Sequence, residues 1–251
     1  MLKIAVLGAG RMAQEIIKVI NDSDSCCLGG VWARSDNVVS GITASDQLPE
    51  VFAGADVAID FTLASATTEI LRQAVAARKP LVCGVSGLDK SQMQLLADAS
   101  RQVPLLYDRN MSYGIAVLTR LVHQLGTAFT TGFSSEIHET HHRHKIDAPS
   151  GTALLLGEAL AESRGQSFDE VYDYNPDGNT EPASNAIKFV VSREGEVPGD
   201  HSVVFHNASE TVTLTHSVAD RRVFAEGAVK AAHWLVNQPV GRYRMVDLLN
   251  Q

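Results

Sequence analysis

The opening twenty residues, MLKIAVLGAGRMAQEIIKVI, constrain the fold more than any other stretch of the sequence. Residues 2–7 form a short apolar run, and a Gly-Ala-Gly turn follows it directly. Apolar residues then recur at Ile16, Ile17, Val19 and Ile20, which is the spacing of one buried helix face. This order predicts a strand, a tight turn and a helix, the repeating unit of a parallel sheet.

The same alternation continues through the N-terminal half of the chain. Further apolar runs predict strands at 27–32, 55–61, 81–84 and 104–107. Helical patterns lie between the later strands, at 65–77 and 90–101. Strands that alternate with helices favour a parallel sheet covered by helices on both faces, an architecture typical of nucleotide binding.

The pattern changes after about residue 112. A helical stretch runs to about residue 124, and a mixed or antiparallel sheet is predicted from the strands at 133–140, 186–192, 201–206 and 211–216, the last two joined by a hairpin loop at 207–210. Helical spacing returns at 224–236, and this helix is expected to pack back on the first domain. We therefore predict one α/β domain formed by residues 1–111 and 219–251, interrupted by an inserted α+β domain at 112–218. The Pro-, Gly- and Asn-rich residues 173–185 predict a surface loop.

Composition excludes several classes of function. The formal net charge of −8 argues against general nucleic-acid binding, which needs a basic face. No stretch reaches the roughly 18 apolar residues of a membrane span, and the start lacks the layout of a signal peptide. Three cysteines match neither a disulfide framework nor a metal spacing and suit a reducing compartment. The expected location is the cytoplasm.

The turn after the first strand has the form Gly-x-Gly-x-x-Ala, in the sequence GAGRMA. Gly8 and Gly10 would let the backbone approach a pyrophosphate, and the helix that follows offers the positive end of its dipole. Arg11 would add a cation beside the phosphates. The alternative is a tight turn in a fold that binds no nucleotide.

The end of the second predicted strand bears on which dinucleotide binds. An acidic residue there would bind the ribose 2′-hydroxyl group, whereas an arginine would accept a 2′-phosphate. The sequence here is Trp32-Ala33-Arg34-Ser35-Asp36. Arg34 and Ser35 favour NADPH, and Asp36 leaves NADH open. An exposed arginine without a ligand is the alternative interpretation.

Two further motifs, DFT at 60–62 and CGVSG at 83–87, end predicted strands. Ligands of this architecture bind at the carboxyl edge of the sheet, and a glycine-rich strand end would let a flat ring lie against the backbone. The same residues are also ordinary turn formers.

The most unusual stretch is HETHHRHKIDAPSGTA at 138–153, which holds four histidines, an arginine and a lysine within eight positions. A metal site is one interpretation, but the pattern lacks cysteines and helical HExxH spacing. A solvated polar strand end is another. We favour a site for anion binding and proton transfer, because histidine titrates near neutrality and Lys or Arg binds carboxylates. The amides of Gly151 and Thr152 would lie at the start of an apolar helix, ready for a carboxylate.

With the strand ending near Thr140, residues 141–145 are expected to form a loop in which several side chains converge. A small substrate with more than one carboxylate, reduced by a bound dinucleotide, would need both the positive charge and the proton donor of this stretch.

The pattern E-x-H-H-x-x-K-x-D-A-P-S-G-T-A at 139–153 resembles the signature of the 4-hydroxy-tetrahydrodipicolinate reductase family, also called dihydrodipicolinate reductase, of the diaminopimelate route to lysine. Weaker agreement extends over most of the chain, in GAGRMA, DFT, CGVSG, NMSYG, REGEVPGDHSV and RRVFAEGAV. The resemblance implies a Rossmann-type domain for NAD(P)H, an inserted mixed-sheet domain that binds substrate, and a homotetramer. It also implies hydride transfer to a cyclic substrate, with loss of water.

The resemblance assigns roles to individual positions. His141 matches the catalytic acid and Lys145 assists it, while His142, Lys145, Gly151 and Thr152 match positions that bind the substrate carboxylates. The cofactor positions implied by the family or by the turn and strand-end motifs are Gly8, Gly10, Arg11, Met12, Arg34, Phe61, Thr62, Gly84, Val85, Ser86, Asn110, Met111, Ser112 and Arg221.

Three departures from the family pattern concern the cofactor. The glycine turn is one residue shorter and ends in Ala13, Ala33 replaces a frequent glutamate, and Val85 replaces a threonine. These changes leave the choice between NADPH and NADH open. The competing hypotheses are another Rossmann-type reductase or amino-acid dehydrogenase and, outside enzymology, a redox-sensing protein that binds dinucleotide without turnover.

Overall fold

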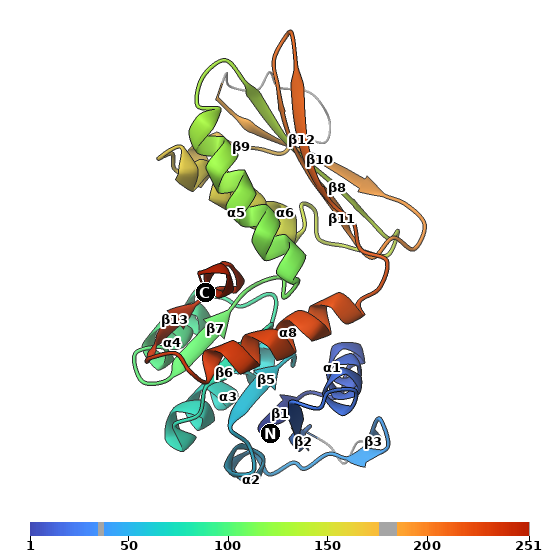
Figure 1. The fold of residues 1–251 in the computed structure, drawn as a ribbon, viewed down its shortest axis with the longest axis vertical. Coiled ribbons are helices and arrows are strands. Elements are labelled where there is room, and N and C mark those ends of the chain that lie inside the picture. The colour runs from blue at the N-terminus through green and yellow to red at the C-terminus, as the bar shows by residue number, and fades with distance from the viewer. Residues whose placement is uncertain (35–37, 176–184, 251) are drawn as a thin grey trace. The chain divides into compact units, whose positions relative to one another are not determined.

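The computed structural model describes residues 1–34, 38–175 and 185–250. The chain forms two compact units (Figure 1). Unit 1 comprises Met1–Tyr113 and Arg221–Gln251, and unit 2 comprises Gly114–Asp220. Unit 2 is therefore inserted into the chain of unit 1.

Unit 1 is built on a six-stranded sheet in which all paired strands are parallel. In spatial order its strands are β13 (Gly241–Tyr243), β7 (Pro104–Tyr107), β6 (Leu81–Cys83), β5 (Val57–Asp60), β1 (Leu2–Leu7) and β2 (Cys26–Trp32). The interior strand β1, between β5 and β2, is fully buried from Ile4 to Leu7. A continuous apolar run is what a strand needs when both of its faces are covered.

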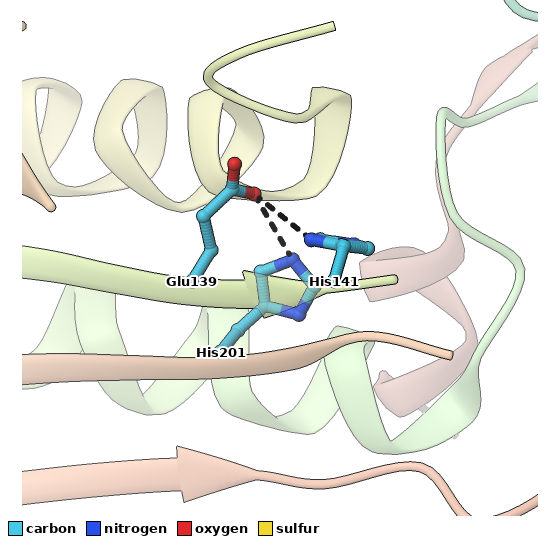
Figure 2. A group of neighbouring side chains, drawn as sticks. All are labelled: Glu139, His141 and His201. Atoms are coloured by element: carbon cyan, nitrogen blue, oxygen red, sulfur yellow. Dashed lines mark ion pairs between the residues drawn. The ribbon is translucent and has the colours of Figure 1, made fainter. Parts of the chain in front are cut away.

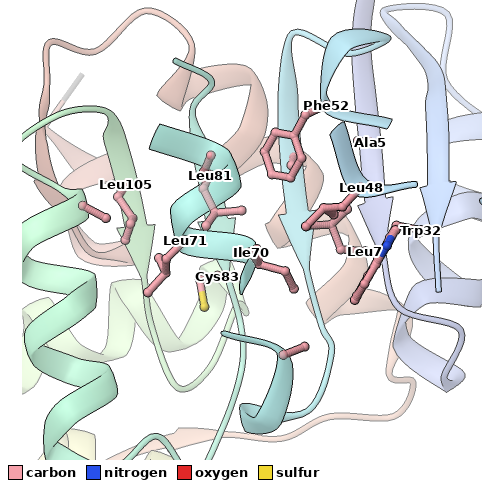
Figure 3. Packing of buried hydrophobic residues seen from close by; sticks show 14 of the residues in the cluster. Ala5, Leu7, Trp32, Leu48, Phe52, Ile70, Leu71, Leu81, Cys83 and Leu105 are labelled. Atoms are coloured by element: carbon pink, nitrogen blue, oxygen red, sulfur yellow. The ribbon is translucent and has the colours of Figure 1, made fainter. Parts of the chain in front are cut away.

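Helices cover this sheet because each has one apolar face. They are α1 (Arg11–Asn21), α2 (Leu48–Ala53), α3 (Ala64–Ala77), α4 (Lys90–Ala99) and α8 (Arg222–Leu235). Unit 1 also contains the short 3₁₀ helix η1 (Met245–Leu249) and a separate two-stranded hairpin of β3 (Val38–Val39) and β4 (Ile42–Thr43). Helix α4 begins with a capping box, in which the Asp89 side chain and the Gln92 side chain each bind the other residue's backbone amide. Figure 3 shows the core on one side of the sheet, where Phe52, Leu48, Ile70 and Trp32 pack together.

Unit 2 contains a five-stranded mixed sheet and two longer helices. Its elements are α5 (Tyr113–Ala128), which begins at the last residue of unit 1, β8 (Ser134–His141), α6 (Gly151–Ser163), α7 (Phe168–Val171), β9 (Tyr172–Asp173), β10 (Ile187–Arg193), β11 (Asp200–His206) and β12 (Thr211–His216). The strand order is β12-β11-β8-β10-β9; β8, β10 and β9 are parallel, and β11 is antiparallel to both β8 and β12. Leu118 of α5, Leu156 of α6 and Ile137 of β8 share one core, so both helices cover the same face of the sheet (Figure 1).

The predicted fold class, a Rossmann-type parallel sheet with an inserted mixed-sheet domain, is confirmed. One local expectation was wrong. Residues 141–145 were expected to be loop, but His141 is the last residue of β8, because its pairing with Arg193 extends the strand by one residue. Most of the predicted surface loop at 173–185 lies outside the described residues. Within the described ranges, none of the helices combines the length and apolar character needed to cross a membrane.

Candidate active site

The glycine turn of unit 1 has the geometry that close approach to a ligand requires. Gly8 has a φ of +117°, and a Cβ atom there would lie 3.2 Å from the carbonyl oxygen of Phe61. Only glycine adopts this conformation without strain. Gly10 caps α1 in extended backbone, with no side-chain hydrogen bond to the first helical amides and open space around its Cα. The first amides of α1 are therefore available to an anion.

A cavity of about 390 Å³ adjoins this turn. It is bounded by the ends of β1, β2 and β5 and by the start of α3, at the carboxyl edge of the parallel sheet. The residues that line it are Gly8, Ala9, Gly10, Trp32, Ala33, Arg34, Phe61, Thr62, Leu63, Ser65 and Ala66. Five of the predicted cofactor positions (Gly8, Gly10, Arg34, Phe61 and Thr62) thus line one cavity.

Arg34 lies at the rim of this cavity and is held by Ser65. Its guanidinium group donates to the carbonyl oxygen of Ser65 at 2.7 Å and to the Ser65 hydroxyl at 3.2 Å. The side chain is otherwise exposed, so it presents a fixed positive charge to the cavity. Ser35 and Asp36, which entered the choice between NADPH and NADH, lie outside the described residues.

The ends of β5 and β6 meet through Phe61. A Cβ atom at Gly84 would lie 2.5 Å from the Phe61 ring. A flat ring was expected to lie against the backbone of this glycine-rich strand end, and at Gly84 that ring is the side chain of Phe61. Val85 is buried in the core, and Ser86 is exposed. Asp60 is fully buried, accepts the Thr62 amide at 2.9 Å, and has its pKa raised to about 6 by that burial.

The remaining predicted cofactor residues of unit 1 do not line the cavity. Arg11 is exposed and Met12 half-buried in the first turn of α1. Asn110 accepts the amide of Ser112 at 2.8 Å, while Met111 and Ser112 are buried. Arg221 precedes the first residue of α8 and is half-buried.

In unit 2, the alternation of β8 separates the histidines of the unusual stretch. Ile137, Glu139 and His141 are buried on one face, whereas Glu136 and His138 lie on the other and pair with each other at 2.7 Å. Side chains two apart on a strand share a face, so Glu139 and His141 are brought together by β8 itself. His138 is separated from them.

Glu139 is the centre of a buried polar cluster. Figure 2 shows His141 and His201 directed at the same carboxylate oxygen: Glu139 Oε2 lies 3.5 Å from His141 Nδ1 and 3.8 Å from His201 Nε2. The other oxygen, Oε1, accepts the Arg193 guanidinium group at 3.2 Å and the Ser150 amide at 3.0 Å. The exposed fractions are 2% for Glu139, 7% for His141 and 4% for His201, so water screens the electrostatic interactions within the cluster little.

Burial sets the protonation of the two histidines. Burial is the largest cause that lowers the pKa of His141 to about 4 and that of His201 to about 3. For His141, the value of about 4 also includes lowering by the positive charges of Lys145 and Arg193 and opposition from the negative charges of Glu139 and Asp147. Both imidazoles are therefore neutral at pH 7 in the free protein. His141 Nδ1 forms no hydrogen bond with any described residue.

The loop after β8 carries the lysine of the signature. Lys145 Nζ binds both carboxylate oxygens of Asp147 at 2.8 Å. Arg193 fixes this loop by donating to the carbonyl oxygens of Asp147 at 2.6 Å and Lys145 at 3.3 Å. His142 is half-buried and donates its amide to Val197 at 2.8 Å, whereas His144 is exposed.

Helix α6 begins beside Glu139. Ser150 caps it by accepting the Ala153 amide at 3.2 Å, while the Ser150 amide donates to Glu139 and its hydroxyl pairs with His201 Nε2 at 3.2 Å. Gly151 and Thr152 are the first two residues of this helix. The predicted acid and the predicted anion-binding amides are therefore joined through Glu139 and Ser150.

The atoms of Glu139, His141 and His201 lie within 4.8 Å of one another, a separation that one metal ion could bridge. However, Arg193 already donates to the carboxylate, and both Arg193 and Lys145 act electrostatically on His141. A metal ion would be a further cation and would be repelled by these charges. We therefore interpret the cluster as a hydrogen-bonding and proton-transfer network.

Sequence reasoning missed three members of the cluster. Glu139 lies two positions before His141, but the strand was expected to end near Thr140, so strand periodicity was not extended to His141. His201 lies on β11 and Arg193 on β10. Strand pairing brings both residues beside β8, and the register of that pairing cannot be predicted from local sequence patterns.

Gly199 leads to a prediction about the second nitrogen of His141. It has a φ of +152°, and a Cβ atom there would lie 2.8 Å from His141 Nε2. We expect Gly199→Ala to displace the imidazole and lower kcat by ~10–100-fold, given the sensitivity of proton transfer to geometry. Steady-state kinetics on the purified variant measure this effect.

The matched control is Gly195→Ala, in the loop that joins β10 to β11 and also contains Gly199. Gly195 also has a positive φ, +48°, but a Cβ atom there would have no neighbouring atom within 4 Å. Both variants carry backbone strain, and only Gly199→Ala meets His141. Equal kcat values for the two variants would show that the space beside Nε2 is irrelevant.

The two units together define a class of protein. Unit 1 has a parallel sheet whose first strand ends in a glycine turn and an open helix N-terminus beside a cavity, and unit 2 carries a buried histidine, a lysine and a second helix N-terminus. This combination is that of a two-domain oxidoreductase of the Rossmann type.

Comparison with known proteins agrees with this class. The family model described as dihydrodipicolinate reductase, N-terminus, matches residues 2–111, and that for the C-terminus matches residues 114–249. A 4-hydroxy-tetrahydrodipicolinate reductase of Sulfurimonas denitrificans is 38% identical over 254 residues, which cover 99% of either chain. The chain belongs to the dihydrodipicolinate reductase family and is an oxidoreductase, as the signature predicted.

Solved structures share the fold at low sequence identity. A dipicolinate-bound dihydrodipicolinate reductase from Paenisporosarcina sp. TG-14 has a TM-score of 0.77 at 20% identity, with 97% of both chains covered. GenD2 from gentamicin A biosynthesis, solved in complex with NAD, has a TM-score of 0.63 at 16% identity, covering 94% of this chain and 85% of the other.

Proposed function

We propose that this chain uses NAD(P)H to reduce 4-hydroxy-2,3,4,5-tetrahydrodipicolinate, with loss of water, to tetrahydrodipicolinate in the diaminopimelate route to lysine. Membership of the reductase family supports the reaction, and the Sulfurimonas relative carries the name of that activity. The observation that carries the proposal in this chain is the unit 2 cluster. One buried carboxylate joins His141 to the start of α6, and Lys145 lies in the connecting loop.

The residues of unit 1 fit a dinucleotide. The cavity of about 390 Å³, the close approach allowed by Gly8 and the uncapped start of α1 suit a pyrophosphate and an adenosine. Gly8, Gly10, Arg11 and Met12 would hold the phosphates. Phe61, Thr62, Gly84, Val85 and Ser86 are proposed for the nicotinamide side, with Asn110, Met111, Ser112 and Arg221 as further contacts. When bound, the reduced dinucleotide supplies a hydride.

We propose that unit 2 binds the substrate and holds the proton. Lys145, His142 and the amides of Gly151 and Thr152 would bind the two carboxylates, because a charged donor and a helix N-terminus both favour anions. His141 would protonate the ring carbon beside the one that accepts the hydride. The proposed division is a cofactor domain of residues 1–111 and 219–251 and a domain of residues 112–218 for substrate binding and homotetramer formation. The expected location is the cytoplasm.

Substrate binding would charge His141. Its pKa of about 4 in the free protein results from burial and from two positive neighbours, so the imidazole is neutral at pH 7. Two substrate carboxylates would bring negative charge next to it and neutralise Lys145. This raises the pKa of His141, so binding takes up a proton and prepares the acid.

Arg34 gives a prediction on cofactor choice. Its guanidinium group, fixed by Ser65 at the cavity rim, is proposed to bind the 2′-phosphate of NADPH. We expect Arg34→Ala to raise KM for NADPH by ~10–100-fold, the effect of losing a charge-assisted phosphate contact, with KM for NADH within about 3-fold. Steady-state kinetics with each cofactor check this. A parallel loss with both cofactors would contradict a role in 2′-phosphate recognition.

The direct test of substrate class is binding of pyridine-2,6-dicarboxylate, a planar analogue, measured by calorimetry in the presence of NADPH. We expect saturable binding with one dicarboxylate per chain. Benzoate, with one carboxylate, should bind more weakly because it can use only one of the two proposed anion contacts. Equal affinity for both compounds would contradict a dicarboxylate site.

A further inference from the structure

Glu139 is a buried charge that takes no direct part in the proposed reaction. Burying a carboxylate is costly unless charged partners and hydrogen bonds compensate it. The compensation here is specific: Arg193 and the Ser150 amide bind Oε1, and Oε2 faces His141 and His201. In an ordinary protein core, an apolar side chain would occupy position 139, between Ile137 and His141 on the buried face of β8.

We infer that Glu139 is the positioning residue of this site, holding His141 with the proton on Nδ1 while it anchors the start of α6. The inference rests on the proposed function, because it acts through the acid named there. It adds a residue to which neither the signature nor the comparisons give a role.

The geometry of His141 separates the tasks of its two nitrogens. Nδ1 lies 3.5 Å from Glu139 Oε2, an ion-pair distance slightly too long for a hydrogen bond. Nε2 points to the space that Gly199 leaves free. When the imidazole takes up a proton, Glu139 balances the new charge at Nδ1, and the proton given to substrate leaves from Nε2. Carboxylate partners commonly fix the tautomer of functional histidines in this manner.

The same carboxylate positions the anion-binding amides. The Ser150 amide donates to both oxygens of Glu139, at 3.0 and 3.1 Å, and Ser150 caps α6. Gly151 and Thr152 follow immediately. A shift of Glu139 therefore moves the acid and the amides together, so the two halves of the substrate site keep their spacing.

The charges around His141 determine what the loss of Glu139 would do. The titratable and charged groups that face the His141–His201 pair come from β8, the loop after it, β10, β11 and β12: Glu139, Lys145, Asp147, Arg193, His201, His216. Only two of these are negative, and Asp147 is paired with Lys145. Without Glu139, the positive charges of Arg193 and Lys145 would oppose protonation of His141.

The test compares Glu139→Gln with Glu136→Gln. Glu136 lies on the opposite face of the same strand and also pairs with a histidine, so it is a matched control outside the site. We expect Glu139→Gln to lower kcat by ~10–100-fold, the usual effect of losing such a partner. KM should change less than about 3-fold, because the glutamine oxygen can still accept the Ser150 amide that holds the start of α6. Glu136→Gln should retain wild-type kcat.

The pH profile separates positioning from a merely structural role. Activity requires protonated His141 in the substrate complex, so kcat falls as the pH rises through the pKa of that group. Because Glu139 raises this pKa, Glu139→Gln should move the alkaline fall in kcat to lower pH, by about one unit. Glu139→Asp should retain most of the wild-type position. A fall at the wild-type pH in Glu139→Gln overturns the inference.

A measurement on the unmodified protein covers the case in which Glu139→Gln does not fold. Nitrogen-15 NMR of histidine-labelled protein, with His141 assigned by the signal missing in His141→Gln, reports its tautomer at pH 7. We expect the Nδ1–H form, and the Nε2–H form would overturn the inference. This result does not depend on turnover, whereas absence of turnover in the wild-type protein would contradict the proposed function alone.

Discussion

Replacing His141 with glutamine is expected to lower kcat by ~10²–10⁴-fold, the usual contribution of a general acid, with KM changed by less than about 5-fold. Glutamine keeps a polar side chain of similar reach at the end of β8 but cannot deliver a proton to carbon. The substrate carboxylates would still meet Lys145 and the first amides of α6. Steady-state kinetics with NADPH measure both constants.

His138→Gln is the matched control for this prediction. His138 lies on the same strand, faces away from the cluster and pairs with Glu136. It should retain wild-type kcat. A His141→Gln enzyme as active as His138→Gln would remove His141 from the mechanism.

The same variant has a second expected property, in ligand binding. Wild-type affinity for pyridine-2,6-dicarboxylate should increase as the pH falls from 8 toward 5, because the complex binds a proton that the free protein, with a His141 pKa of about 4, does not hold. His141→Gln should lose this dependence. Calorimetry at several pH values provides the comparison.

Replacing Lys145 with alanine is expected to affect both substrate binding and turnover. The ammonium group is proposed to bind a substrate carboxylate, so its removal should raise KM by ~10–100-fold, the value of one charge-assisted hydrogen bond. We expect kcat to fall as well, by ~10-fold or more, because charge that develops on the substrate loses its nearest cation. This loss of binding and turnover should exceed the effect of breaking the Lys145–Asp147 ion pair alone, because that pair is partly exposed and contributes little to stability.

Lys188→Ala provides the comparison for Lys145→Ala. Lys188 also forms an ion pair within unit 2, with Glu136 at 3.3 Å, but lies outside the cluster. Its removal should leave KM and kcat unchanged. If Lys145→Ala bound pyridine-2,6-dicarboxylate as tightly as wild-type protein, the proposed carboxylate contact would be wrong.

Local patterns predicted most of the parallel sheet because each element carries its own signal. The strand from Leu2 to Leu7, its glycine turn and α1 follow from a buried run, a turn and one apolar helix face. The edge strand β13 was missed, since Gly241-Arg242-Tyr243 is short and not apolar. It is ordered by parallel pairing with β7, a contact between residues more than a hundred positions apart.

The active site was predictable only in part. The density of His and Lys around His141 and the helix start at Gly151 were visible in sequence and indicated an acid and an anion site. The connection between the acid and the anion site through Glu139 was not visible in the sequence. His201 and Arg193 reach Glu139 only through the register of three strands, and the pairing of Lys145 with Asp147 was not predicted from the sequence.

We propose that the chain reduces a cyclic dicarboxylate with a nicotinamide cofactor. The most direct test follows oxidation of NADPH and of NADH while the preceding synthase generates the substrate from pyruvate and aspartate semialdehyde. We predict rapid oxidation that needs the synthase, is inhibited by pyridine-2,6-dicarboxylate and is lost in His141→Gln. No oxidation with either cofactor, in a protein that still binds NADPH, would contradict the proposed reductase activity and favour a protein that senses the dinucleotide without turnover.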